Sequence, residues 1–205
     1  MIINVRGTSG SGKSTLVRNI IDAYDVCERV MVPGRKRPLC YRLWRGTQFY
    51  AQDPFQGQNT PPPQRPPDLV VLGHYDTACG GCDTIPTTQA AFDMAVEAHH
   101  LLGCHVLYEG LLLSADVKHT LELAGDVGPE NLLVVELSTT LEECLASVNK
   151  RRAARDDTLP PVNPKNTESK WKGVRSSSQK LRDAGLAVET LDRDAALARV
   201  LEVLS

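Results

Sequence analysis

Five short apolar runs recur along the chain, and each is followed by a stretch in which apolar residues have helical spacing. The runs contain few polar residues and do not alternate, a pattern typical of strands buried on both faces of a parallel sheet. They cover residues 2–5, 68–73, 105–108, 132–137 and 186–190. Apolar spacings of three and four, clearest at 91–102, predict helices after them. These predicted helices cover about 15–21, 88–102, 114–123, 140–155, 167–184 and 193–204.

The order of these elements predicts an α/β fold. Strand and helix alternate, and parallel strands joined by helices pack with helices on both faces of the sheet. We therefore expect a five-stranded parallel sheet flanked by helices. At 205 residues, the chain is long enough for a substantial core and fits a single domain over residues 1–205.

An insertion at about 29–67 separates the first two parallel strands. Residues 30–32 and 39–44 are predicted as short strands on either side of a turn at 33–38, which makes a β-hairpin. Six prolines at 51–67 exclude a helix or a central strand there. We expect a proline-rich loop after the hairpin rather than a domain boundary.

The hairpin segment is locally basic. The chain as a whole has a formal net charge of −2, which gives no global sign of a polyanionic partner. Residues 29–52 nevertheless contain no acidic residue; their basic and aromatic residues are Arg29, Arg35, Lys36, Arg37, Arg42, Arg45, Tyr41, Trp44, Phe49 and Tyr50. Such a segment can hold phosphates and stack on bases. A solvated hairpin with ordinary surface charge is the alternative.

Three features of the whole chain predict a cytoplasmic protein. No apolar run approaches the roughly 18 residues that span a bilayer, so no membrane partner is expected. The first predicted strand begins at residue 2, which leaves no room for a targeting peptide. The six cysteines are scattered, as expected for reduced thiols. The sequence leaves the oligomeric state open.

Residues 7–14 match G-x-x-x-x-G-K-[ST], the phosphate-binding P-loop, between the first strand and a helix. The backbone N–H groups of such a loop and the following helix N-terminus bind phosphates. We expect Lys13 to reach the β- and γ-phosphates and Ser14 to ligate Mg²⁺. A chance glycine-rich turn is the alternative, but it does not explain the strand and helix on either side. The residues expected to contact the nucleotide are Gly7, Thr8, Ser9, Gly10, Ser11, Gly12, Lys13, Ser14 and Thr15.

Two carboxylates follow the next parallel strands, where ligands of open α/β sheets collect. Glu109 ends the strand at 105–108 and is predicted to hold Mg²⁺ beside the P-loop hydroxyl. Asp76, after the strand at 68–73, is the predicted base that takes the proton of an acceptor hydroxyl. Helix capping by Glu109 and an Asx-turn at Asp76 are the alternatives.

Three arginines end the predicted helix at 140–155. Arg151, Arg152 and Arg155 precede a polar, proline-containing loop, as in the lids of small-molecule kinases. Arg151 and Arg155 lie one turn apart and are predicted to act together on the triphosphate, Arg151 also as a nucleotide contact. We place this lid at about 150–170. A helix-end charge cluster is the alternative.

Cys79 and Cys82 have C-x-x-C spacing around Gly80 and Gly81. A structural zinc site needs four ligands, and a second pair with this spacing is missing. Thioredoxin-like redox chemistry is a further alternative. We favour a tight turn in which the glycines let a substrate approach the backbone.

Three blocks together resemble phage-encoded P-loop kinases of the nucleoside and nucleotide kinase group, the 5-hydroxymethyluracil DNA kinases of thymidine hypermodification. The blocks are 6–15, 73–84 (with Gly73-His74-Tyr75-Asp76) and 162–170 (Val-Asn-Pro-Lys-Asn-Thr-Glu-Ser-Lys). The resemblance implies a P-loop kinase fold and ATP·Mg²⁺-dependent phosphorylation of a 5-hydroxymethyl group in DNA, in the host cytoplasm. A kinase of a free nucleoside or nucleoside monophosphate is the first alternative, and a non-kinase P-loop NTPase is the second.

The resemblance also suggests where a modified duplex would bind. The expected substrate contacts are residues of the hairpin, of the loop after the second parallel strand, and of the lid. They are Arg35, Lys36, Arg37, Tyr41, Arg42, Trp44, His74, Tyr75, Gly80, Gly81, Lys165 and Lys170, with Lys172 nearby.

Overall fold

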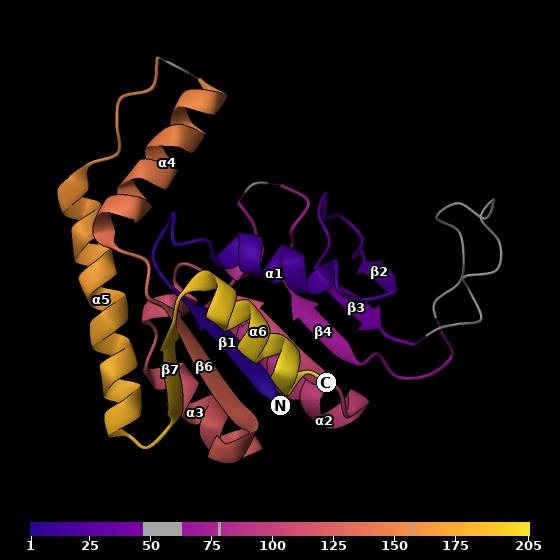
Figure 1. The fold of residues 1–205 in the computed structure, drawn as a ribbon. Coiled ribbons are helices and arrows are strands. Elements are labelled where there is room, and N and C mark those ends of the chain that lie inside the picture. Colours follow the sequence, from indigo (N-terminus) through magenta and orange to yellow (C-terminus); the bar gives the residue numbers. More distant parts are fainter. Residues whose placement is uncertain (47–62, 78, 157) are drawn as a thin grey trace.

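A central sheet of seven strands organises the chain, in the order β2-β3-β4-β5-β1-β6-β7 (Figure 1). The computed structural model describes residues 1–46, 63–77, 79–156 and 158–205. Phe49, Tyr50 and most of the proline-rich stretch at 51–67 therefore lie outside the described residues. The strands are β1 Ile2–Arg6, β2 Val26–Val30, β3 Cys40–Trp44, β4 Leu69–Leu72, β5 His105–Glu109, β6 Leu132–Leu137 and β7 Ala187–Leu191.

The five predicted parallel strands are confirmed, and the hairpin belongs to the same sheet. β4, β5, β1, β6 and β7 run parallel, whereas β3 pairs antiparallel with β4 and β2 antiparallel with β3. The predicted first hairpin strand at 30–32 is wrong. β2 begins at Val26, and Met31 and Val32 are 51% and 37% exposed in the turn, because Val26 pairs with Trp44 across the hairpin.

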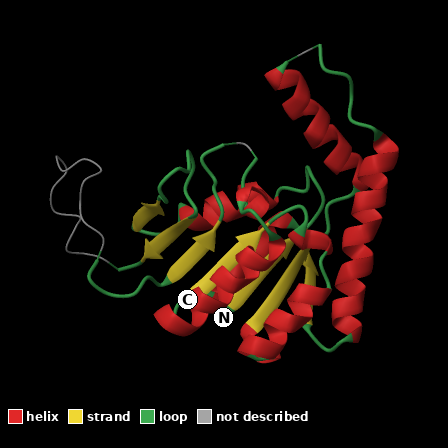
Figure 2. Cartoon of the chain, turned by 180° about the vertical axis from the view of Figure 1, so that it is seen from behind, coloured by secondary structure: helices red, strands yellow, loops and turns green. Residues whose placement is uncertain are grey.

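Helices cover both faces of the sheet (Figure 2). Alternate residues of the central strands point to opposite faces, so Ile3 and Val5 pack with one helix layer and Ile2 with the other. α1 and α6 form the first layer; α2, α3 and α5 form the second. The helices are α1 Lys13–Ile21, α2 Thr88–Leu102, α3 Lys118–Val127, α4 Leu141–Arg155, α5 Pro164–Asp183 and α6 Arg193–Val203.

Two helix starts differ from the sequence prediction. The helix expected from 114 begins at Lys118, because Ser114 lies in a short 3₁₀ turn at Leu113–Ala115. The helix expected from 167 begins at Pro164. Asn163 caps it by accepting hydrogen bonds from the Lys165 and Asn166 N–H groups, and proline fits the first turn of a helix.

α4 and α5 form a helical pair beyond β7, and the tip of the pair rises above the carboxyl ends of the strands (Figure 1). Thr140 caps α4 through a reciprocal capping box with Glu143, which fixes the direction in which α4 leaves the sheet. Among the described helices, none combines the length and apolar character needed to span a bilayer.

Candidate active site

A cavity of about 340 Å³ opens at the carboxyl ends of β1 and β5, where ligands of open α/β sheets bind. The P-loop forms its floor. The loop after β4, the end of β5, α4 and the start of α6 form its walls. Its lining residues are Thr8, Ser9, Gly10, Gly12, Lys13, Ser14, Thr15, Cys79, Gly80, Asp83, Glu109, Leu111, Ser147, Lys150, Arg151 and Arg193.

The P-loop is shaped for an anion. Gly12, the residue before α1, has φ +99°, and a Cβ there would lie 2.6 Å from the Cδ atom of Arg193, so only glycine fits. No side chain caps α1, which leaves the N–H groups of its first turn for a bound group. The Lys13 ammonium donates hydrogen bonds to the carbonyl oxygens of Gly7 at 2.7 Å and Thr8 at 3.3 Å.

Glu109 meets the P-loop at the end of β5. Its Oε1 accepts a hydrogen bond from the Ser14 hydroxyl at 2.7 Å, and its Oε2 lies 3.9 Å from the Lys13 Nζ atom. Burial raises the pKa of Glu109, against the opposing effects of Lys13 and Ser14. Two hard oxygen ligands side by side suit Mg²⁺, which takes one or two protein ligands and completes its shell with phosphates and water.

The C-x-x-C segment has a structural explanation. His74 and Gly81 pair in an antiparallel bridge that closes the loop after β4. A Cβ on Gly81 would lie 2.8 Å from the Glu109 carboxylate, so glycine permits this loop to pack directly on Glu109. Cys79 is exposed and Cys82 is buried. In the described part of the chain, no group of three or more His, Cys, Asp or Glu side chains is placed to bind a metal.

Asp76 lies outside the cavity lining. Its Oδ1 accepts a hydrogen bond from the Tyr41 hydroxyl at 2.9 Å and lies 3.2 Å from the Arg29 guanidinium. A different carboxylate, Asp83, lines the cavity, and its Oδ1 accepts a hydrogen bond from the Leu111 N–H at 2.8 Å. No role was predicted for Asp83, although it stands directly after the C-x-x-C segment.

The two lid arginines lie in different places. Arg151 lines the cavity and donates a hydrogen bond to the Cys79 Sγ atom at 3.2 Å, so it reaches from α4 to the loop after β4. Arg155 is exposed and does not line the cavity. Two further cations in the lining, Lys150 and Arg193, were not predicted as site residues. The position of Arg193 just after β7, at the carboxyl edge, is the signal that would have found it.

Tyr41 and Trp44, two of the four aromatic residues expected to stack on bases, are not placed to do so, which corrects the prediction for these two. Tyr41 and Trp44 are 3% and 2% exposed because both side chains turn into the protein, and the Trp44 indole donates a hydrogen bond to the Arg65 carbonyl. His74 and Tyr75, which were also expected to bind substrate, are buried as well. These four residues support the loop after β4 and the hairpin instead of presenting a binding surface.

The turn of the hairpin contacts a wall of the cavity. The Arg35 guanidinium donates hydrogen bonds to the carbonyl and hydroxyl oxygens of Thr84, at 3.3 and 3.4 Å, and Arg37 contacts the His74 ring. Lys36 is exposed between them. The turn thus contacts the residue that follows Asp83 and a residue at the start of the same loop.

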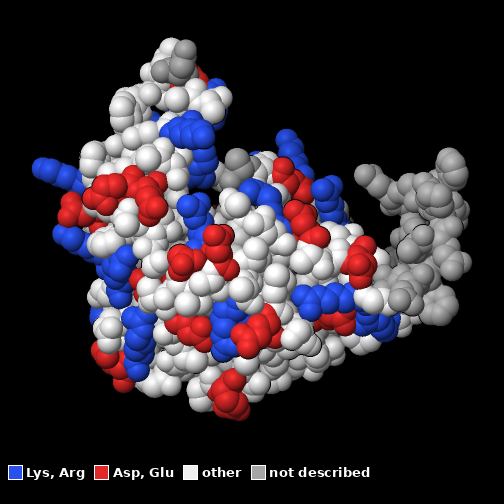
Figure 3. All heavy atoms as spheres, viewed as in Figure 1, with Lys and Arg blue, Asp and Glu red and all other residues white. Residues whose placement is uncertain are grey.

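The remaining expected DNA contacts lie farther out. Arg42 pairs with Glu28 at 3.5 Å, and Lys165 and Lys170 are exposed on α5, outside the cavity lining. Lys and Arg side chains alternate with Asp and Glu over much of the face drawn in Figure 3. That face is therefore not a broad basic surface, in keeping with the net charge of −2.

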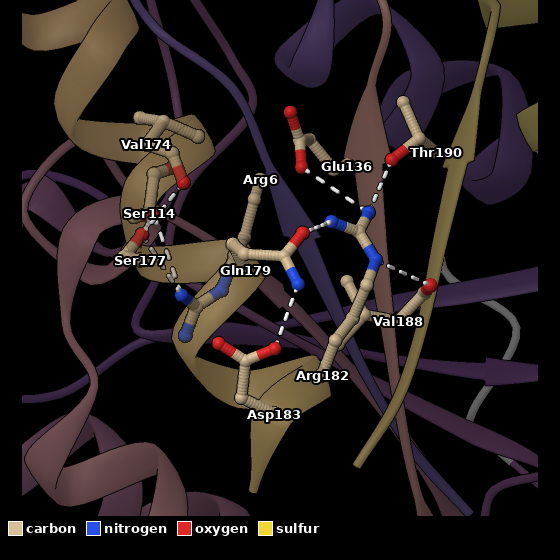
Figure 4. A network of polar contacts seen from close by, with 10 residues as sticks. All are labelled: Arg6, Ser114, Glu136, Val174, Ser177, Gln179, Arg182, Asp183, Val188 and Thr190. Atoms are coloured by element: carbon tan, nitrogen blue, oxygen red, sulfur yellow. Dashed lines mark hydrogen bonds and ion pairs between the residues drawn. The ribbon is translucent and has the colours of Figure 1, made fainter. Parts of the chain in front are cut away.

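A buried polar network holds the base of the P-loop. Arg6, the last residue of β1, is fully buried, and its Nη2 donates hydrogen bonds to the Asp116 carbonyl and the Thr120 hydroxyl, both at 2.7 Å. Its Nη1 approaches the Ser114 carbonyl and the Ser177 hydroxyl (Figure 4). Burial lowers the pKa of Arg6. β1 is thereby tied to α3 and to α5.

Ser114 connects this network to the cavity. Its hydroxyl accepts a hydrogen bond from the Gly7 N–H at 3.3 Å and donates one to the Gly110 carbonyl at 2.7 Å. The first residue of the P-loop and the residue after Glu109 are therefore held by one side chain. A mostly parallel sheet carries the P-loop sequence at the carboxyl end of β1, and a buried carboxylate lies beside it. This combination is typical of nucleotide-binding proteins of the P-loop class.

Comparisons with known proteins narrow this class. A 5-hmdU DNA kinase of Pseudomonas phage PaMx11 is 44% identical over 203 residues, which cover 99% of this chain and 96% of that protein. The chain belongs to the family of 5-hmdU DNA kinases. Proteins of the same name from Bacillus phage SP10 and Delftia phage PhiW-14 are 21% and 26% identical. Those matches cover 100% and 90% of this chain, but 28% and 65% of the phage proteins.

The chain was also compared with protein-family models and with solved structures. No protein-family model matches the chain. A solved structure of deoxyadenosine kinase from M. mycoides with bound dATP matches with a TM-score of 0.43 at 15% identity, over 100% of this chain and 97% of that one. That overlay is too loose to carry an inference about the site.

Proposed function

We propose that this protein transfers the γ-phosphate of ATP to the 5-hydroxymethyl group of 5-hydroxymethyluracil in DNA and so activates the base for hypermodification. The observation that carries the proposal is the 44% identity to a phage 5-hmdU DNA kinase over nearly the full length of both chains. The cavity supports it, because P-loop N–H groups, a lysine, a lid arginine and a buried carboxylate face one space.

The triphosphate of ATP lies along the P-loop in this proposal. Lys13, which donates hydrogen bonds to the Gly7 and Thr8 carbonyls, turns toward the β- and γ-phosphates when they are present. The Ser14 hydroxyl and the Glu109 carboxylate would hold Mg²⁺, because their oxygens, 2.7 Å apart, are a suitable pair of hard ligands. A bound Mg²⁺ ion would offset the charge of the phosphates.

Cations on two other elements complete the anion site. Arg151 and Lys150 reach the cavity from α4, and Arg193 reaches it from the start of α6. Their positive charges stabilise the negative charge that spreads over the γ-phosphoryl oxygens during transfer. We assign the largest of these effects to Arg151, because it extends across the cavity to Cys79.

DNA approaches from the side of the hairpin turn. Arg35, Lys36 and Arg37 lie next to the segment that carries Asp83, where they would contact phosphates near the modified base. Lys165 and Lys170 on α5 are candidates for more distant phosphates. A 5-substituent projects into the major groove, so the hydroxyl is reached there or after the base is flipped out.

An acceptor panel tests this function. The protein is incubated with γ-labelled ATP, Mg²⁺ and one of four acceptors: a hydroxymethyluracil duplex, the matched thymine duplex, thymidine, or thymidine monophosphate. We expect label in the hydroxymethyluracil duplex alone. Label in thymidine or its monophosphate would instead assign the chain to free nucleosides or nucleotides, and ATP hydrolysis without any labelled acceptor would assign it to the non-kinase NTPases.

A further inference from the structure

Two aspartates compete for the role of base on the acceptor hydroxyl, and the structure separates them. Asp76 lies outside the cavity lining, and its Oδ1 is engaged by Tyr41 and Arg29. A base must reach the hydroxyl that attacks the γ-phosphorus, either directly or through one water. The position and the partners of Asp76 therefore suit an anchor for the hairpin better than a base.

Asp83 has the properties that Asp76 lacks. It lines the cavity together with Ser14 and Glu109. The Leu111 N–H fixes its Oδ1 at 2.8 Å. Among the described residues its Oδ2 has no hydrogen-bond partner, so that oxygen is available to an incoming group.

Asp83 also marks the boundary between the cavity and the acceptor side. A second, smaller hollow of about 50 Å³ lies next to it, and Asp83 lines both spaces. Its other lining residues are Cys82, Ile85, Pro86, Thr87, Thr88, Ala91, Leu112 and Leu113. Thr84, the residue after Asp83, accepts hydrogen bonds from Arg35 of the basic turn. Asp83 thus lies between the cavity and the side on which the proposed acceptor would meet the basic turn.

We propose that Asp83, and not Asp76, is the catalytic base of this chain, an assignment that rests on the proposed function. The acceptor O–H bond breaks, and its proton passes to Asp83 Oδ2. The acceptor oxygen forms a bond to the γ-phosphorus while the bond from that phosphorus to the β,γ-bridging oxygen breaks. The products are the phosphate monoester and ADP, and Asp83 then releases its proton to water.

A pair of matched variants tests the assignment. Asp83→Asn keeps an oxygen that can accept from the Leu111 N–H but cannot take a proton, so the loop should hold its shape. We expect a loss of phosphoryl transfer of about 10²- to 10⁴-fold in single-turnover assays, with ATP affinity unchanged. Asp76→Asn, the matched control, should retain a rate close to that of the wild type. The opposite ranking of the two variants would overturn the assignment.

Magnesium dependence separates a base from a metal ligand. If Asp83 held the ion, excess Mg²⁺ would restore part of the rate of Asp83→Asn, and this rescue would also overturn the assignment. We expect the Mg²⁺ concentration at half-maximal rate to equal that of the wild type. The comparison uses whichever acceptor the wild type phosphorylates. If that acceptor is a free nucleoside, the proposed function fails, while the two variants still decide which aspartate is the base; transfer to no acceptor refutes both.

Discussion

Glu109 is a carboxylate whose position favours catalysis over stability. It is 2% exposed, and burial raises its pKa, while the partner ammonium of Lys13 is 3.9 Å away. A folded-state pKa above the unfolded value means that the ionised carboxylate stabilises the fold less than its protonated form does. The placement of Glu109 beside Ser14 therefore fits the proposed phosphate site better than a stabilising role in the core.

Glu109→Gln should therefore separate activity from stability. We expect phosphoryl transfer to fall by at least about 10²-fold, because the charge that would hold Mg²⁺ is lost. Thermal unfolding without nucleotide at pH 7 should show a Tm equal to or above that of the wild type. A Tm that falls together with the rate would show that Glu109 is instead needed for the fold.

The sign of the pH dependence follows from the same raised pKa. A protonated Glu109 contributes stability that is fully present below its unfolded pKa and is lost as pH rises through its higher folded pKa. The advantage of Glu109→Gln over the wild type should thus shrink as pH falls through that range. Urea titrations of both proteins at several pH values, without Mg²⁺, measure it. A gap that widens on acidification would contradict the raised pKa.

At this scale the P-loop, Glu109 and Arg151 could be placed at the cavity from the sequence, whereas Asp83 and Arg193 were missed. Lys13 and Ser14 belong to one continuous motif, so their chemistry is visible in the sequence. Asp83 reaches the cavity only because the His74–Gly81 bridge closes the preceding loop. Arg193 reaches it only because β7 ends at the same edge as β1. The contact of Asp83 leaves no local pattern, whereas the place of Arg193 just after β7 is a signal that sequence reasoning could have used.

The helical pair α4–α5 is the element that would form the proposed lid. Both Arg151 and Arg155 were expected to act on the triphosphate, but only Arg151 lines the cavity. Arg151→Ala should lower the rate by at least about 10²-fold while nucleotide affinity changes little, since the charge acts mainly in the transition state.

Arg155→Ala is the matched control on the same helix. We expect it to retain most of the wild-type rate in the same single-turnover assay, because its side chain is exposed outside the cavity. Equal losses in the two variants would mean that α4 turns or shifts when nucleotide binds. In that case both arginines act, as the sequence predicted.

The Ser177 hydroxyl links α5 to the segment around Ser114 and to Arg6. The Ser177 oxygen lies 2.7 Å from the Val174 carbonyl, 3.2 Å from the Ser114 carbonyl and 3.4 Å from the Arg6 Nη1 atom. Ser177→Ala should lower the free energy of unfolding by about 1–2 kcal/mol, since buried partners lose a hydrogen bond. The neighbouring Ser176→Ala, at a position that is not fully buried, should change it by less than about 0.5 kcal/mol. Urea unfolding that shows no difference between the two would contradict this link.

Sequence patterns resolved the buried elements better than the edges. Strands covered on both faces, such as β6, appear as uninterrupted apolar runs, and the predicted bounds of β6 agree with the structure. β2 is an edge strand in which exposed and less exposed residues alternate, so it has no continuous apolar run. The prediction therefore placed the strand at the nearby Val-Met-Val run at 30–32, most of which lies in the turn. α5 begins earlier than its apolar pattern predicted, because Asn163 caps the helix and Pro164 fits its first turn.

Charge is the property of the whole molecule that bears on its acceptor. Because the net charge is −2, DNA binding must depend on a local group of cations, such as those of the hairpin turn. Binding of a hydroxymethyluracil duplex should weaken steeply with salt. Replacing Arg35, Lys36 and Arg37 with Gln should make the logarithm of the DNA-binding constant depend less steeply on the logarithm of the salt concentration. The slope should fall by about one for each phosphate that these side chains neutralise in the wild type.

The control for that salt series is Lys165→Gln with Lys170→Gln on α5. If the hairpin turn is the main DNA contact, this pair should change the slope less than the triple variant does. A triple variant with an unaltered slope would remove the hairpin turn from the DNA-binding surface. The P-loop chemistry would be unaffected by that result.

The position of the transferred phosphate is the most direct test of the proposed reaction. A hydroxymethyluracil duplex is treated with γ-labelled ATP and Mg²⁺, its strand ends are blocked, and it is digested to nucleosides that are separated and identified by mass. We predict that all label is recovered on the 5-hydroxymethyl oxygen of the modified nucleoside, and that Lys13→Ala gives none. Label on free nucleotide, or a duplex left unlabelled while ATP is consumed, would contradict the proposed reaction.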